Sequence, residues 1–201
     1  MKKLIIIFLI FFSIFYIYLL TCDEKIYYLS ISNNYNSNDF SNIIAKKLKR
    51  NNLLEIHVNE FSNNNNRITD YIDMIDDNKY IIKNNKKIHF KNALIKADII
   101  TLSLGTKDFI TNYGDSTEKV LTIRNNIETL IKKIREYSKE DIYFISIYSE
   151  YVDSKYIDKL NNDIKSICSD NKIKFININN NYNYITENNN ELISKYVIIN
   201  K

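Results

Sequence analysis

Beyond residue 25, the most apolar run of the chain opens the stretch DIITLSLGTKD, residues Asp98 to Asp108. The run itself, Ile99 to Leu104, has the length and β-branched content of a fully buried strand. Gly105 and charged residues follow it directly, which predicts the end of the strand there. In open α/β sheets, functional groups gather at the carboxyl ends of the strands. We therefore expect the functional edge of the protein at Gly105 to Asp108.

On both sides of this stretch, short apolar runs alternate with amphipathic stretches of helical period. The predicted strands cover residues 26–31, 53–58, 99–104, 142–147 and 173–178. The predicted helices cover residues 39–50, 68–75, 90–96, 120–137, 156–167 and 191–199, while residues 79–88 are ambiguous. This alternation predicts a five-stranded parallel sheet with helices on both faces, a three-layer α/β/α sandwich in one domain over residues 23–201.

The N-terminus predicts a membrane segment. Lys2 and Lys3 precede eighteen residues without a charge, residues 4–21. A helix of that length nearly spans a bilayer core of about 30 Å, and the two lysines predict a cytoplasmic N-terminus. Residues 1–22 are thus a membrane anchor or, because LLTC at Leu19 to Cys22 is similar to a lipobox, a lipoprotein signal with Cys22 lipidated. A cleaved signal peptide is the third alternative. Each places the domain on the extracytoplasmic side of the cell membrane.

Composition excludes several classes of protein. The chain has no Pro or Trp, two Gly, 16 Tyr and 31 Asn, a skew that a strongly AT-biased genome explains. The net charge of +4 falls to +2 without Lys2 and Lys3, so no nucleic-acid partner is expected. Two cysteines exclude a disulfide framework, and Cys168 lies on the apolar face of its helix as a buried, inert thiol. His57 and His89 have no metal-ligand spacing, and the sequence contains no phosphate-cradling glycine loop and no paired C-x-x-C, so neither a metal nor a cofactor is expected.

The order of the segments resembles that of the SGNH (GDSL-type) hydrolase family of esterases and lipases, over residues 25–199. The quoted stretch Asp98 to Asp108 is similar to the third block of that family, and Arg67 to Asp70 resembles the end of the second block. The first block corresponds to YYLSISNN, residues Tyr27 to Asn34, and Lys91 to Asp98 resembles small low-GC bacterial members. The resemblance implies the predicted sandwich and an ester-hydrolysing ancestry.

The chemistry that the resemblance implies needs a Ser nucleophile, Gly and Asn donors for the oxyanion, and a C-terminal Asp-x-x-His. Gly-Asp-Ser of the first block falls on Ser32, Asn33 and Asn34, so the nucleophile position is Asn34. The second-block Gly falls within Asn63 to Asn66. In the third block, Gly105 and Asp108 are kept, and Lys107 stands in place of the oxyanion Asn. Near the C-terminus, Asn181 and Tyr184 stand in place of the family's Asp and His, with a register that is fixed to within several residues.

No histidine follows His89, so the general base is absent in any register. We therefore expect a pseudoenzyme whose strand-end cleft holds a small acyl or glycan ligand, with Lys107 offering a charge to an anion. The alternatives are a divergent hydrolase of cell-envelope acyl esters, acting through an unrecognised nucleophile, and a structural or interaction protein without a ligand. Gly114-Asp115-Ser116 spells the family motif, but it precedes a long helix, which Asp115 or Ser116 is expected to cap.

Overall fold

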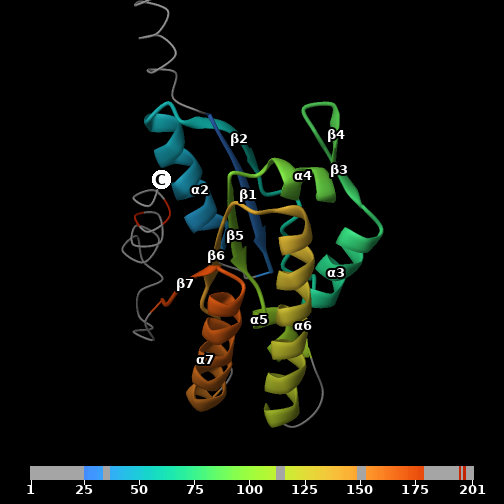
Figure 1. Ribbon diagram of the computed structural model, residues 1–201, viewed down its shortest axis with the longest axis vertical. Coiled ribbons are helices and arrows are strands. Elements are labelled where there is room, and N and C mark those ends of the chain that lie inside the picture. The colour runs from blue at the N-terminus through green and yellow to red at the C-terminus, as the bar shows by residue number, and fades with distance from the viewer. Residues whose placement is uncertain are drawn as a thin grey trace, which may run out of the picture.

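The computed structural model describes residues 25–33, 37–111, 116–148 and 153–178, together with Lys195 and Val197. Its strands are β1 (Ile26–Ser32), β2 (Leu54–Val58), β3 (Tyr80–Lys83), β4 (Lys86–His89), β5 (Ile99–Ser103), β6 (Asp141–Ile145) and β7 (Lys174–Ile176). Its helices are α2 (Ser37–Arg50), α3 (Ile68–Asp76), α4 (Phe90–Lys96), α5 (Thr106–Thr111), α6 (Ser116–Tyr137) and α7 (Ser154–Asp170). Figure 1 shows their arrangement around a central sheet.

Five of the strands form one parallel sheet in the order β2-β1-β5-β6-β7. β1 pairs with β5 in a register that joins Tyr28 to Ile99 and Ser32 to Ser103. The strand from the opening stretch thus lies at the centre of the sheet, as expected for a run that is buried along its whole length. The predicted five-stranded parallel sheet is confirmed.

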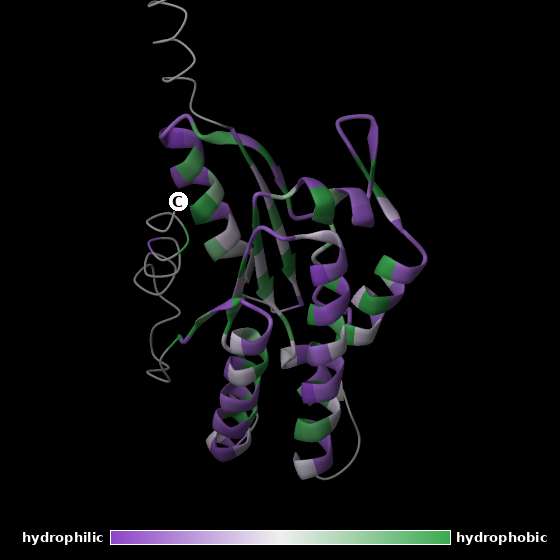
Figure 2. Cartoon of the chain, in the orientation of Figure 1, coloured by the Kyte–Doolittle hydropathy of each residue, from purple (hydrophilic) through white to green (hydrophobic). Residues whose placement is uncertain are grey.

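Successive residues of the central strands enter two different cores, because side chains alternate between the faces of a sheet. The larger core packs one face, including Leu29 and Ile100, against α3, α4, α6 and α7. The smaller core packs the other face, including Tyr28 and Ile99, against α2 and Val197. Figure 2 shows hydrophobic residues along the strands and hydrophilic residues on much of the outer surface of the helices. The three-layer architecture is therefore also confirmed.

The ambiguous segment at residues 79–88 forms an antiparallel hairpin, β3–β4, which is not part of the main sheet. Asn84 and Asn85 make its two-residue turn, with φ of 50° and 60°. Asn tolerates such positive φ angles better than most residues, and two-residue hairpin turns need them. Figure 1 shows the hairpin projecting at the end of the molecule where β1 begins.

Two predicted segments fall largely outside the described residues. The expected closing helix, residues 191–199, is represented by Lys195 and Val197, both helical. The expected membrane segment, residues 4–21, and Cys22 are not described. Of the helices that are described, none combines the length and the apolar character needed to cross a membrane.

Cys168 is fully buried in the larger core, on the inner face of α7. Burial raises the pKa of its thiol to about 12, so the thiolate is not formed near neutral pH. The predicted buried, inert thiol is confirmed.

Candidate functional site

Three segments that are far apart in the sequence meet at the carboxyl ends of the parallel strands. They are the end of β1 at Ser32 and Asn33, the loop after β2, and the end of β5 continuing into α5. The backbone N–H of Asn63, in the loop, donates to the carbonyl of Ser32 at 3.0 Å. The N–H of Asn33 donates to the carbonyl of Ser103 at 3.1 Å. The segments that the resemblance aligns with the three family blocks therefore meet at one edge of the sheet, within the residues that are described.

The buried side chain of Asn33 joins all three segments. Its Oδ1 accepts a hydrogen bond from the backbone N–H of Gly105 at 3.2 Å. Its Nδ2 donates to the carbonyl of Asn66 at 3.0 Å and to Oδ2 of Asp108 at 3.2 Å. The position of Oδ1 requires an acceptor, and the position of Nδ2 requires a group that donates two hydrogen bonds. An amide satisfies both requirements, whereas an ionised carboxylate has no donor. Asn33 is therefore matched to its surroundings as an amide.

Asp108 is the acidic partner in this cluster, and its side chain is only 2% exposed. Its Oδ1 accepts from the backbone N–H of Ile68, the first residue of α3, at 3.1 Å. Burial raises the pKa of its carboxyl to about 6, although the hydrogen bonds from Ile68 and Asn33 oppose that rise. Asp108 thus links α5 to α3 and β1, and it titrates just below neutral pH.

The loop that corresponds to the second block uses most of its own N–H groups. In residues 63–66, the N–H of Asn63 donates to Ser32, that of Asn65 to Oδ1 of Asn63 at 2.9 Å, and that of Asn66 to the carbonyl of Asn63 at 3.0 Å. An oxyanion needs preformed donors that are free to meet it. Three of the four N–H groups that could serve in this loop already have acceptors inside the protein.

Ser32 is the described serine nearest to the expected nucleophile position, and it is buried. Its Oγ donates to the carbonyl of Ser103 at 3.1 Å, and its carbonyl accepts from the Tyr71 hydroxyl at 2.7 Å. Burial raises the pKa of Tyr71 to about 12, so this phenol remains a hydrogen-bond donor. The Ser32 hydroxyl therefore acts as a structural donor between β1 and β5.

The two histidines of the chain lie away from this edge. The ring of His57, in β2, stacks on Tyr28 with centroids 4.8 Å apart. Burial, reinforced by Lys83, lowers the pKa of its imidazole to about 4. His89, at the end of β4, contacts the carbonyl of Asn78 through Nδ1 at 3.1 Å. No imidazole is therefore available near Ser32 or Gly105, since the chain contains no other histidine.

The structure places the sequence-predicted positions unevenly. Gly105 and Asp108 belong to the strand-end cluster, and Lys107 lies beside them in the first turn of α5, half-buried. Ser116 is the first residue of α6. Asn34, Asn181 and Tyr184 lie outside the described residues, as does Asp115. In the part of the chain that is described, no group of three or more His, Cys, Asp or Glu side chains is arranged to hold a metal ion.

Sequence reasoning did not anticipate the bridging role of Asn33 or the contact of Tyr71 with Ser32. Asn33 does fall on the Asp of the family's Gly-Asp-Ser, and that position was the available signal. Tyr71 carried none, because it has the pattern of an ordinary core residue on the apolar face of α3.

Gly105 occupies a position of the site that requires a glycine. Its φ of +114° is a conformation that L residues rarely adopt, and a Cβ built there would overlap Cδ1 of Ile147. This glycine lets the chain leave β5 sharply while its N–H reaches Asn33.

Gly105→Ala is expected to lower the free energy of unfolding by roughly 2–4 kcal/mol, the sum of backbone strain and overpacking against Ile147. Urea unfolding of the full-length protein in a neutral detergent measures this loss. Thr122→Ala, at an exposed position of α6, is the control and should change stability by less than about 0.5 kcal/mol. Equal effects of the two substitutions would contradict the role given to Gly105.

Comparison with known proteins supports a fold assignment. No protein-family model matches the sequence, and no curated protein matches it. Among solved structures, the chain resembles a mutant of the esterase AlinE4, with a TM-score of 0.53 and 9% sequence identity. The match covers 76% of this chain and 75% of the esterase. At this identity the similarity is one of fold alone, so the chain shares the fold of that esterase.

Proposed function

We propose that this protein is a membrane-anchored, extracytoplasmic SGNH hydrolase-like protein that has lost esterase activity and serves as a pseudoenzyme that binds a ligand. The observation that carries the proposal is the hydrogen bonding of the strand-end cluster. Groups that an esterase must keep free for its substrate are used here to hold the protein together.

The first support for this proposal is that the described strand-end residues do not include a serine paired with a histidine. A neutral serine must lose its proton to attack an ester, and an adjacent imidazole normally takes that proton. The Ser32 hydroxyl is buried and donates to Ser103. His57 stacks on Tyr28, with which it is also paired in the register of β2 with β1. Tyr28 precedes Ser32 by four residues, which is about 13 Å along the strand. Ser32 and His57 therefore cannot form a serine–histidine pair at this edge.

The second support is that the N–H groups expected to bind an oxyanion already have acceptors within the protein. The N–H of Gly105 is engaged by Asn33, and the loop at residues 63–66 uses three of its N–H groups internally. Lys107 occupies the position at which the resemblance requires an Asn amide. A tetrahedral intermediate would have to break these internal bonds before it could be stabilised. We infer that the edge has been retained for its shape, to hold a small acyl or glycan ligand beside the charge of Lys107.

Ester hydrolysis by the full-length protein tests the proposed loss of activity. We expect the rate on short p-nitrophenyl esters to equal that of buffer. Turnover that depends on one serine would instead identify this protein as a divergent esterase.

The location is tested separately. The full-length chain, expressed in a low-GC Gram-positive bacterium, is expected in the membrane fraction, with its domain accessible to protease only from outside the cell. Metabolic labelling with a radioactive fatty acid then separates the two anchoring modes. Label that disappears in Cys22→Ser indicates a lipoprotein, and membrane recovery without label indicates an anchor helix. Full-length, unlabelled protein in the soluble cytoplasm would contradict the proposed location.

A further inference from the structure

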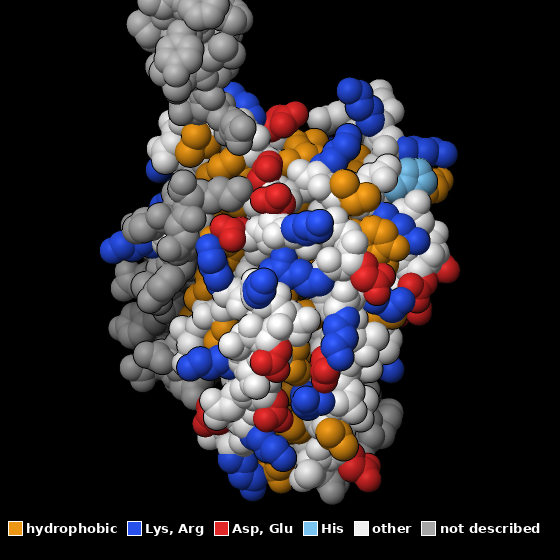
Figure 3. Space-filling model, in the orientation of Figure 1, with side chains coloured by type: hydrophobic (Ala, Val, Ile, Leu, Met, Phe, Trp, Pro, Cys, Tyr) orange, Lys and Arg blue, Asp and Glu red, His pale blue; other side chains and the backbone are white. Residues whose placement is uncertain are grey.

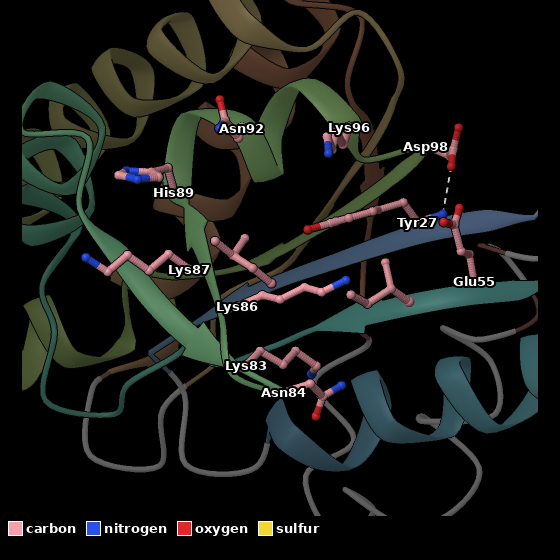
Figure 4. Close-up of a pocket in the computed structure, with 12 residues that line it drawn as sticks. Tyr27, Glu55, Lys83, Asn84, Lys86, Lys87, His89, Asn92, Lys96 and Asp98 are labelled. Carbon is pink, nitrogen blue, oxygen red and sulfur yellow. Dashed lines mark hydrogen bonds between the residues drawn. The ribbon is translucent and has the colours of Figure 1, made fainter.

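A hollow lies near the amino ends of the parallel strands, away from the strand-end cluster. Its volume is about 690 Å³, which is within the range of small-molecule sites. It is bounded by the starts of β1 and β2, by the β3–β4 hairpin and by α4, and Figure 4 shows its lining side chains. Asn33 and Asp108 do not line it, so it is distinct from the strand-end cluster.

The charge of this hollow is predominantly positive. Four lysines line it, Lys83, Lys86, Lys87 and Lys96, against the two carboxylates of Glu55 and Asp98. Figure 3 shows Lys and Arg side chains gathered over this upper part of the molecule, around the hairpin and α4. Because Glu55 and Asp98 repel negative charge at one end of the hollow, a ligand must carry its negative charge at the other end, near the lysines.

Two of the four lysines are engaged elsewhere. Lys83 forms an ion pair with Glu60 and donates to the carbonyl of His57, and Nζ of Lys87 lies 4.6 Å from the ring centroid of Tyr80. Lys86, from β4, and Lys96, from the last turn of α4, form neither an ion pair nor a hydrogen bond with any described residue. In Figure 4, the Lys86 side chain extends into the hollow below Tyr27, and Lys96 lies above it.

Uncharged hydrogen-bonding groups also line the hollow. The Tyr27 hydroxyl points into the hollow, and Asn92 lies beyond it on α4 (Figure 4). Burial and the nearby Glu60 and Glu55 raise the pKa of Tyr27, so its hydroxyl keeps its proton. The backbone of Tyr27 is fixed because its N–H donates to Oδ2 of Asp98 at 2.7 Å and its carbonyl accepts from the N–H of Asp98 at 2.9 Å. The donor is thus held on a rigid strand.

We propose that this hollow binds a phosphate ester, with Lys86 and Lys96 contacting the phosphate oxygens and the Tyr27 hydroxyl donating a further hydrogen bond. Lysine binds phosphate as a point charge, and lysines from two different elements can approach one tetrahedral group from two sides. Glu55, which is exposed at one end, can accept hydrogen bonds from hydroxyl groups of the esterified alcohol. A small polyol phosphate satisfies both requirements.

Such a group could belong to a soluble molecule or to a phospholipid headgroup. The hollow lies at the edge of the sheet where the chain enters β1, directly after the predicted anchor at residues 4–21. A domain joined to its anchor by so few residues keeps this edge near the bilayer, where anionic headgroups attract lysines. A glycerol phosphate group occurs both in soluble phosphate esters and in phospholipid headgroups, so it is used as the probe for both.

The experiment uses the full-length protein in neutral detergent micelles at low ionic strength. One arm titrates sn-glycerol 3-phosphate by calorimetry, and the other follows binding to micelles doped with phosphatidylglycerol, with phosphatidylcholine as reference. The test variants are Lys86→Gln/Lys96→Gln and Tyr27→Phe. The matched control is Lys139→Gln/Lys165→Gln, which removes the same charge at two exposed positions outside the hollow.

Saturable binding is expected in at least one arm, weakened about tenfold or more by Lys86→Gln/Lys96→Gln and about threefold by Tyr27→Phe. The control pair should bind like the wild type. Binding in the soluble arm assigns a free phosphate ester, and binding only to phosphatidylglycerol micelles assigns a lipid headgroup. No binding in either arm, or equal weakening by test and control pairs, would overturn the site. Thermal unfolding followed by circular dichroism confirms that the variants remain folded.

Discussion

Full-length protein in neutral detergent is expected to hydrolyse p-nitrophenyl acetate and butyrate no faster than buffer. Removing a single member of a serine hydrolase triad costs roughly 10⁴–10⁶ in rate, and removing one oxyanion donor costs about 10²–10³. Here the serine near the nucleophile position is buried, no imidazole lies at the edge, and the Gly105 N–H is already bonded to Asn33. Such losses are not additive, so the measured rate should simply reach the background.

The serine variants make this expectation specific. Ser32→Ala, Ser116→Ala and Asn34→Ala should all match the wild type, and Asn34→Ser alone should not create activity, because no base stands ready to take its proton. An active esterase assayed in the same detergent is the positive control. Turnover well above buffer that disappears in one serine variant would refute the loss of activity and identify the nucleophile.

Asn33→Asp is expected to produce the largest change in stability, and one that depends strongly on pH. The carboxylate would still accept from the Gly105 N–H, but its other oxygen would face the carbonyl of Asn66 and Oδ2 of Asp108, where the wild type has distances of 3.0 and 3.2 Å. With both carboxyls ionised and buried, the variant should lose about 3–5 kcal/mol at pH 8. At pH 4.5 a proton on one carboxyl restores a single hydrogen bond, and the loss should fall to about 1–2 kcal/mol.

The wild type supplies the baseline for this pH dependence. The folded-state pKa of Asp108 is about 6, above the ordinary value of 3.8 that applies to the unfolded chain. A group whose pKa is raised on folding contributes stability that is fully present below the unfolded value and is lost as pH rises through the folded value. Asp108 should therefore contribute a decline in the free energy of unfolding between about pH 4 and pH 6. His57, whose pKa falls from 6.5 to about 4 on folding, contributes a rise over much of the same range. The pH dependence is therefore measured as the difference between Asn33→Asp and the wild type, in which the contribution of His57 cancels.

Two further variants isolate the contact with Asp108. Asn33→Asp/Asp108→Asn exchanges the acid and the amide and should recover part of the stability at pH 8, since an amide at position 108 can donate to the new carboxylate while the carbonyl of Asn66 still lacks its donor. Asn161→Asp is the control, because the buried amide of Asn161 also bridges an N–H and a carbonyl, both of Ile147. Its loss should depend less on pH than that of Asn33→Asp. Equal losses at pH 4.5 and pH 8 for Asn33→Asp would contradict the coupling.

Local sequence periodicity was enough to predict the main sheet and most of its helices. Runs such as Ile99 to Leu104 are long, apolar and β-branched, so burial and propensity agree along the whole element. The hairpin at residues 80–89 was ambiguous because neither face of it is fully buried: Ile81 and Ile88 are only partly buried against the core, and Ile82 is 66% exposed. Its signal was the Asn84–Asn85 turn. The helix α5 spans only Thr106–Thr111, too short to show a helical period.

The sequence by itself determined the fold class, the order of the segments and the absence of any histidine after His89, because these depend only on local periodicity and on which residue types are present. Only the tertiary structure decided how the polar residues at the strand ends are used. The Asn33 amide faces Asp108 and Gly105 across more than seventy residues of chain, and Lys86 and Lys96 line a common hollow with Tyr27. These partnerships depend on the registry of parallel strands and on burial. Both properties arise when distant segments pack, so they leave no trace in any short stretch of the chain.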